Sequence, residues 1–154
     1  MSIDQRLAEL GITLPAAAAP VAAYVPVVRS GNLLFVSGQV SFAEDGSRIT
    51  GRLGEDMELE AGQEAARRCG LMVLAQVAQE LGGSLDRVSR IVKLGVFVNS
   101  SANFTDQPKV ANGASELMQD VFGEAGRHAR AAVGVPALPL GVAVEVDAVV
   151  EVRD

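Results

Sequence analysis

The C-terminal stretch Val142–Val152 is the feature that most constrains how this chain can fold. Its residues alternate well between apolar and polar positions. One parity holds Val142, Val144, Val146, Ala148, Val150 and Val152, and the other holds Ala143, Glu145, Asp147, Val149 and Glu151. A period of two predicts a strand with one face in the core. Because Pro139 and Gly141 punctuate the chain just before it, the stretch from Arg127 is predicted to form two strands joined by a short turn.

Apart from Arg127 at its very start, Arg130 is the one guanidinium in this mostly apolar pair. Two readings stay open: its planar fork faces a cleft, or it is a solvated residue at a strand end. Regular pairing about Pro139 would set Val133 opposite Glu145, and Arg130 would then point to the sheet face opposite Glu145. A bulge, or a position just before regular pairing begins, would remove that conflict.

The rest of the chain supplies helices and further strands. Apolar residues at spacings of three and four predict helices over Leu59–Leu81 and about Pro108–Phe122, besides a short N-terminal helix capped by Ser2. The predicted strands are Tyr24–Arg29, Leu33–Gln39 and Arg90–Asn99, with a short edge strand near Arg48–Thr50. The order ββαβαββ predicts an α+β fold in which two helices cover one face of a mixed sheet.

Length, charge and composition narrow the domain organisation and the partners that this chain can have. A chain of 154 residues predicts a single domain, 1–154, in which residues 1–20 form the N-terminal helix and an extended arm. A net charge of −6 argues against nucleic-acid binding, since that affinity rests on clustered Lys and Arg. The single cysteine, Cys69, lies in a helical apolar stripe and reads as a small buried hydrophobe. Without an apolar run of about 18 residues or an N-terminal signal pattern, we expect a cytoplasmic protein that does not bind membranes.

Familiar cofactor motifs are missing from the sequence. The lone His128 has no His or Cys partner at ligand spacing, so it is read as a satisfied or solvated histidine and no metal is expected. The sequence contains no G-x-S-x-G and no P-loop, and no G-x-G-x-x-G follows a strand. We therefore expect no cofactor.

The run R-x-x-V-x-V-x-x-L-P-x-x-x-x-V-E-V-x-A, from Arg130 to Ala148, resembles the C-terminal signature of the RidA/YjgF family of small deaminases, formerly described as endoribonuclease L-PSP. The stretch YVPVVRSGNLLFVSGQV also resembles the opening hairpin of that family. The resemblance covers roughly Val21 to Val152 and implies a chorismate-mutase-like fold. It further implies a homotrimer whose sheets meet, with ligand clefts between neighbouring subunits. We expect Phe35, Ala143 and Val149 on or near the sheet face that contacts the neighbouring subunits.

The same resemblance implies the chemistry. Arg130 matches the substrate-binding Arg of the family, and Glu145 matches its water- or imine-facing Glu. The implied activity is hydrolysis of small 2-imino or enamine acids to 2-keto acids and ammonia. Further residues implied for substrate binding are Tyr24, Asn112, Gly38 and Ala132.

The chain departs from the family at three places. Ala131 and Ala132 follow the Arg where Ser-Cys is common, Ser115 replaces an aromatic, and the N-terminal arm is longer. These departures indicate a divergent subgroup. One alternative is therefore a non-catalytic protein that binds small carboxylates in the same cleft. The endoribonuclease of the older family name is less favoured, because the chain is acidic and lacks a basic patch.

Overall fold

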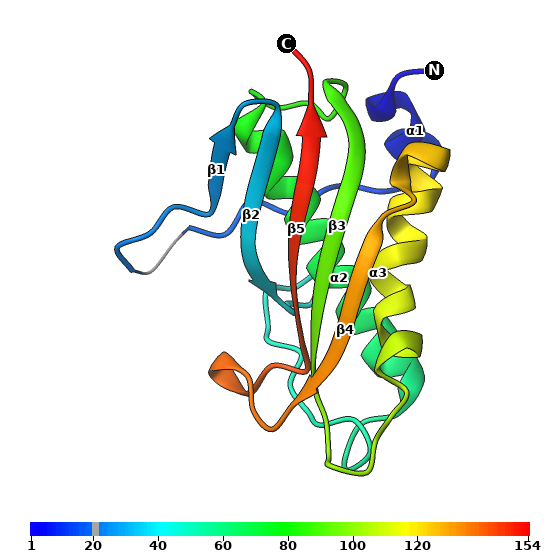
Figure 1. Cartoon of the computed structure of the whole chain (residues 1–154). Coiled ribbons are helices and arrows are strands. Elements are labelled where there is room, and N and C mark those ends of the chain that lie inside the picture. The colour runs from blue at the N-terminus through cyan, green and yellow to red at the C-terminus, as the bar shows by residue number, and fades with distance from the viewer. Residues whose placement is uncertain (20–21) are drawn as a thin grey trace.

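Five strands form one sheet in the order β1-β2-β5-β3-β4 (Figure 1). The computed structural model describes residues 1–19 and 22–154. The elements are α1 (Ile3–Glu9), β1 (Val27–Ser30), β2 (Leu33–Val40), α2 (Leu59–Glu80), β3 (Val88–Asn99), α3 (Gln107–Phe122), η1 (Gly123–Gly126), β4 (Ala129–Val135), η2 (Pro139–Gly141) and β5 (Val144–Val152). This arrangement confirms the predicted ββαβαββ order and the α+β class.

The last two strands do not form the hairpin predicted from the sequence. β5 pairs antiparallel with β2 and β3, whereas β4 lies beyond β3 at the sheet edge and runs parallel to it. Glu145 and Val133 are therefore both partners of Phe97, on opposite sides of β3. The reason is topological: α3 carries the chain back along the sheet, so β4 repeats the direction of β3, and η2 then crosses to β5.

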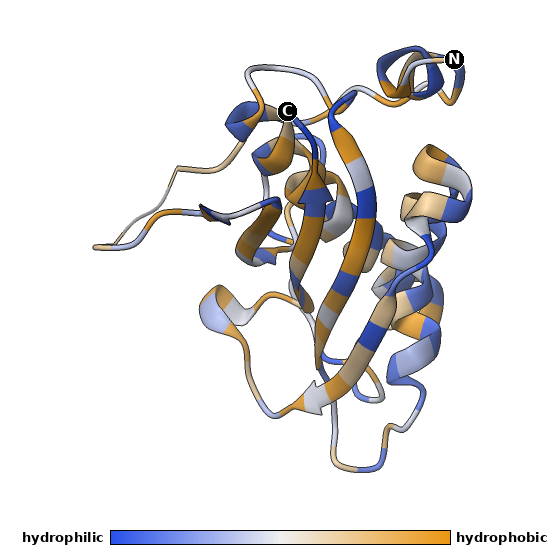
Figure 2. Cartoon of the chain, turned by 45° about the horizontal axis from the view of Figure 1, so that its top comes forward, coloured by the Kyte–Doolittle hydropathy of each residue, from blue (hydrophilic) through white to orange (hydrophobic). Residues whose placement is uncertain are grey.

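The alternation predicted for β5 is confirmed by its burial. The Val144 parity is buried throughout, and the Glu145 parity is only partly covered. β5 is thus a central strand with one face in the core. Figure 2 shows the matching bands of apolar and polar residues along the sheet.

Both long helices pack on the same face of the sheet, α2 mainly against β2 and β5, and α3 against β3 and β4 (Figure 1). The two helices approach closely where Gly113 of α3 meets α2, because a Cβ on Gly113 would collide with the backbone carbonyl of Gln63. Cys69 is buried in α2, as predicted, and its thiol lies 3.3 Å from the carbonyl oxygen of Val144. Burial raises the pKa of the Cys69 thiol well above its ordinary value.

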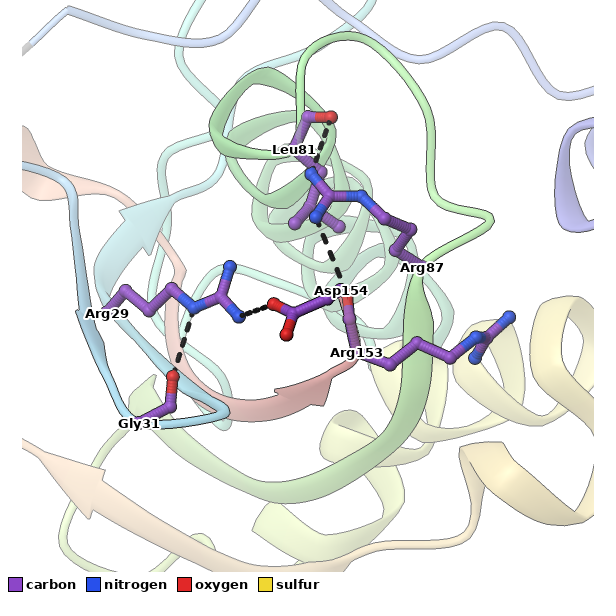
Figure 3. Close-up of polar contacts among 6 residues, drawn as sticks. All are labelled: Arg29, Gly31, Leu81, Arg87, Arg153 and Asp154. Carbon is purple, nitrogen blue, oxygen red and sulfur yellow. Dashed lines mark hydrogen bonds and ion pairs between the residues drawn. The ribbon is translucent and has the colours of Figure 1, made fainter.

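The N-terminal helix begins as predicted, at a capping box in which Ser2 and Gln5 satisfy each other's backbone N–H groups. At the far end of the chain, two arginines tie the C-terminus to the rest of the fold (Figure 3). Arg29 bonds the Asp154 carboxylate at 3.1 Å, and Arg87 donates to the carbonyl oxygen of Arg153 at 3.5 Å. Arg87 also donates to the carbonyl oxygen of Leu81, just after α2. A cation at that position also suits the negative end of the α2 dipole.

Three local predictions are corrected. β1 begins at Val27, not Tyr24, since Pro26 has no N–H to donate and residues 22–24 bend. Arg48–Thr50 contributes only isolated bridges, one of them between Thr50 and Val142. Ala143, expected on or near the open face, precedes β5 and is fully buried, and its N–H donates to the carbonyl oxygen of Ile49. The last residue of the predicted arm, Pro20, lies outside the described residues, as does Val21.

No helix of residues 1–19 and 22–154 lies on the second face of the sheet (Figure 1). Its exposed apolar side chains include Val28, Phe35 and Val133, each about half exposed. Phe35 is paired with Val149, so those two residues lie on this face as expected. None of the helices in the described ranges has the length and apolar character needed to cross a bilayer.

Candidate functional site

Arg130 is held by two side chains of α3. Its register with Leu94 and Ala148 turns it to the helix-covered side of the sheet, at the outer strand β4. There its Nη1 donates to Asn112 Oδ1 at 2.8 Å and to Ser115 Oγ at 3.0 Å. Asn112 and Ser115 are three residues apart on the helix, so both face the same way.

The hydrogen bonds around Arg130 have only one consistent direction when His128 is neutral. His128 Nδ1 lies 2.6 Å from the carbonyl oxygen of Gly126, which can only accept, so Nδ1 carries the proton. The other ring nitrogen, Nε2, then accepts the hydroxyl proton of Ser115 at 2.9 Å. The Ser115 oxygen is left to accept from Arg130, as the geometry requires.

The surroundings of His128 favour that neutral form. Partial burial lowers the pKa of His128 below its ordinary value, and the positive charge of Arg130 acts in the same direction. The bond to Gly126 acts the other way. Of the two alternatives left by the sequence, a satisfied or a solvated histidine, His128 is satisfied, and it contacts Ser115, which holds Arg130.

One edge of the Arg130 guanidinium stays free. Both Nη1 protons are committed to α3, while Nη2 and Nε make no hydrogen bond to any described residue. The guanidinium lines a shallow pocket of about 200 Å³. The pocket residues are Ser115, Gln119, Gly126, Arg127, His128 and Arg130. An Nη2/Nε edge matches the two oxygens of a carboxylate.

A second pocket, of about 520 Å³, is lined by residues from the N-terminal arm, the segment before β1, and β2, α2, η2 and β5. It collects three of the residues singled out from the sequence, namely Tyr24, Gly38 and Glu145. The remaining lining residues are mostly apolar: Ala18, Ala19, Pro26, Ser37, Gln39, Val40, Phe42, Met72, Gln76, Pro139 and Leu140. Gln76 fastens the N-terminal arm here, donating to the carbonyl of Ala18 at 2.8 Å and to Gln39 Oε1 at 3.2 Å.

Glu145 has an environment suited to proton transfer. Its carboxylate lies over Gly38 of the neighbouring strand, where any Cβ would collide with it. Partial burial raises the pKa of Glu145 above its ordinary value, and the nearby Asp147 carboxylate raises it further. Asp147 itself lies over Gly95 in the same manner. Glycines on adjacent strands thus make room for both carboxylates.

The residues predicted from the sequence therefore fall into two groups on one chain. Arg130 and Asn112 are together on the helix side, and Ala132 follows on the same side of β4. Glu145 points to the opposite face, beside Phe97 and Val40. The sequence left open whether Arg130 and Glu145 share a face; the structure sets them on opposite faces, through the three-strand register and not through a hairpin. No group of three or more His, Cys, Asp or Glu able to hold a metal ion occurs among the described residues.

The fold and these two groups define an α+β domain with an arginine-centred polar pocket and a separate carboxylate-bearing apolar pocket. The chain belongs to the family described as "YjgF/chorismate_mutase-like, putative endoribonuclease", whose model matches residues 4–152. The resemblance drawn from the C-terminal motif and the opening hairpin is thereby confirmed.

Individual proteins are also similar to this chain along nearly its whole length. The chain is 57% identical to Protein TCP17 of Trypanosoma cruzi, over 99% of this chain and 95% of that protein. It is 28% identical to a 2-iminobutanoate/2-iminopropanoate deaminase of Dermatophagoides farinae, over 92% and 95% of the two chains. A crystal structure of Atu1372 from Agrobacterium tumefaciens, a protein described as of unknown function, superposes with a TM-score of 0.90 at 47% identity, covering 99% and 94%.

Two residues near the site were not assigned a role from sequence. In the sequence, Ser115 is noted only as a departure from the family, and His128 only as a satisfied or solvated histidine. Nothing in their spacing of thirteen residues signals contact, since one lies in α3 and the other precedes β4. The signal that could have found them is their position beside Asn112 and Arg130, once the crossover between helix and strand is known.

Proposed function

We propose that this protein is a cofactor-independent deaminase that hydrolyses small 2-imino or enamine acids to 2-keto acids and ammonia. The observation that carries the proposal is the guanidinium of Arg130, fixed by α3 on one side and free along its Nη2/Nε edge. Such an edge binds a carboxylate in a bidentate manner. The relative named as a 2-iminobutanoate/2-iminopropanoate deaminase supports the same chemistry.

Glu145 is the proposed proton carrier. Starting from the protonated imine, the Glu145 carboxylate removes a proton from water while the water oxygen attacks the imine carbon, and the electron pair of the C=N bond moves to nitrogen to give a carbinolamine. The protonated Glu145 then returns its proton to the amine nitrogen. The C–N bond breaks as the carbinolamine hydroxyl gives its proton back to Glu145 and forms the C=O bond, releasing ammonia and the 2-keto acid. A raised pKa suits a group that must both accept and donate near neutral pH.

The proposed cleft is shared between subunits of a homotrimer. Arg130 and Glu145 lie on opposite faces of one sheet, so a second copy must bring its Glu145 to the Arg130 of the first. The helix-free face supports association, since Phe35 and Val133 leave nearly half of their surfaces exposed there. Tyr24 and Gly38 would enter the cleft with Glu145, and Asn112 and Ala132 with Arg130.

Ammonia release tests this proposal. Imines generated in situ by an amino-acid oxidase should be hydrolysed faster with the protein present, and Arg130→Ala should abolish the acceleration while leaving the fold intact. Semicarbazide trapping or coupled ammonia detection measures the rate. Failure to accelerate any imine, with carboxylate binding retained, would favour a second function.

That second function is a carboxylate-binding protein without turnover. The specific observation in its favour is the divergence after Arg130, where Ala131 and Ala132 bring no polar side chain to the cleft. Thermal stabilisation by pyruvate that depends on Arg130, without imine hydrolysis, would identify it.

A further inference from the structure

The hydrogen bonds of Arg130 continue beyond its direct partners. Ser115 accepts from Arg130 at 3.0 Å and, with His128 neutral, donates to Nε2 of His128 at 2.9 Å. The ring is in turn fixed through Nδ1 by the backbone carbonyl of Gly126 at 2.6 Å. Three elements, α3, η1 and β4, thus meet in one chain of directed bonds.

Resting on the proposed role of Arg130, we infer that Ser115 and His128 are positioning residues that aim the Nη2/Nε edge of Arg130 at the substrate carboxylate. His128 acts through Ser115: its unprotonated Nε2 takes the hydroxyl proton and turns the Ser115 lone pair toward Nη1. Neither residue needs to contact the reacting atoms.

The alternative orientation of the same groups would not hold Arg130 in this way. If Nε2 carried the proton, it would donate to Ser115, and Nδ1 would present a lone pair to the lone pairs of the Gly126 carbonyl. Two facing acceptors at 2.6 Å repel, so the Nδ1–H tautomer is required. The charged groups around the ring are Arg130 and Arg127, both of which line the pocket, and Glu124, which pairs with Arg127 at 3.6 Å.

His128 is the single histidine of the chain, so its NMR signals identify it without assignment. Nitrogen-15 shifts of the imidazole at neutral pH should report the Nδ1–H tautomer in the wild-type protein. In Ser115→Ala the same spectrum should show Nε2 without its hydrogen-bond donor. An Nε2–H tautomer in the wild-type protein would overturn the inference, because the bond chain would then run in reverse.

Carboxylate affinity provides the functional test, with pyruvate as the probe. Ser115→Ala should raise the Kd for pyruvate about tenfold, as expected for losing one hydrogen bond to a charged group. Ser115→Thr keeps the hydroxyl and should stay near the wild-type affinity. The matched control is Ser84→Ala, which also removes a hydroxyl making two hydrogen bonds, to Asp4 and to the Asp86 N–H, but outside this pocket. It should leave the Kd unchanged.

A double-variant cycle shows whether His128 acts through Ser115. His128→Leu alone should match the loss in Ser115→Ala, His128→Gln should recover part of it through its amide oxygen, and the double variant should lose no more than either single one. For the imine, KM should rise with little change in kcat, because the carboxylate is bound equally in ground and transition states.

These outcomes separate this inference from the proposed function. Additive losses in the double variant, or an unchanged pyruvate Kd in folded Ser115→Ala, would overturn the positioning role while Arg130→Ala still abolished binding. Unchanged binding in Arg130→Ala would instead overturn the role of Arg130 itself.

Discussion

Arg130 and Glu145 owe their properties to neighbours that lie far from them in sequence. The guanidinium is oriented by Asn112 and Ser115 of α3, and the carboxyl of Glu145 occupies space that Gly38 leaves open. Arg130 is therefore suited to binding an anion, and Glu145 is suited to exchanging a proton. Both assignments can be examined by single substitutions.

Arg130→Lys should not restore what Arg130→Ala removes. An ammonium is a point charge that cannot bond Asn112, Ser115 and both oxygens of a carboxylate in one plane. We expect a loss in kcat/KM on the order of a hundredfold, as for breaking a charge-assisted bidentate pair. Imine hydrolysis kinetics measure it, and an Arg130→Lys protein as active as the wild type would return Arg130 to the status of a solvated strand residue.

Asp147→Asn should shift the pH dependence of hydrolysis toward acid. Burial and the Asp147 carboxylate both raise the pKa of Glu145, so removing the second cause lowers that pKa. Glu145 then reaches its basic, ionised form at a lower pH, and the rising limb of kcat/KM against pH moves down with it. A pH–rate profile of both proteins checks the shift; a limb that moves toward alkali would contradict the role of Glu145 as the base.

At the residue scale, the sequence indicates which residues belong to the candidate site better than it indicates which side chains surround them. Arg130, Glu145 and Asn112 could be singled out because they match motif positions. The bond from Ser115 to His128 could not, because it depends on how α3 lies against the start of β4. The pocket formed with Ala18 and Gln76 likewise depends on where the N-terminal arm packs.

The elements follow from the sequence where periodicity is strong, and fail where topology decides. The predicted bounds of β5 and α2 agree with the structure to within two residues, because their apolar spacing is unambiguous. The predicted pairing of β4 with β5 is wrong. The short turn at Pro139 indicates a hairpin when only the neighbouring residues are considered. Because the chain crosses over through α3, β4 runs parallel to β3. β3 therefore lies between β4 and β5, and β4 does not pair with β5.

The contact between the two long helices gives a prediction at this scale. Gly113→Ala should destabilise the fold by about 1–3 kcal/mol through overpacking, although helix propensity alone would favour Ala by about 1 kcal/mol. The obstacle is the backbone carbonyl of Gln63, which cannot turn aside. Urea unfolding measures the change.

Gly70→Ala is the matched control for that contact. Its new Cβ would meet first the end of the Leu117 side chain, at 3.0 Å, and a side-chain end can shift. Its cost should be clearly smaller than that of Gly113→Ala. Equal or reversed costs would show that α3 does not approach α2 as closely as described.

The whole molecule presents a sheet with one covered and one open face. The open face combines apolar side chains such as Phe35 and Val133 with the carboxylates of Glu145 and Asp147. A monomer would leave this surface in water, which supports association of copies through it. Association is also what the proposed cleft needs, because one chain separates Arg130 from Glu145.

The molar mass in solution should be three times the 16.0 kDa of one chain at micromolar concentration. Phe35→Lys places a charge on the open face and should shift the population toward monomer. Light scattering coupled to size exclusion measures both. A wild-type protein that runs at the monomer mass would contradict the shared cleft.

Complementation between two inactive variants tests the central claim most directly, that Arg130 of one subunit works with Glu145 of another. Arg130→Ala and Glu145→Gln chains would be purified separately, then unfolded, mixed and refolded together, with native mass spectrometry confirming mixed oligomers. Random mixing of equal amounts should leave roughly a quarter of the clefts with both native residues, and activity should recover toward that fraction of wild type. Mixed oligomers that remain as inactive as the separate variants would contradict the account.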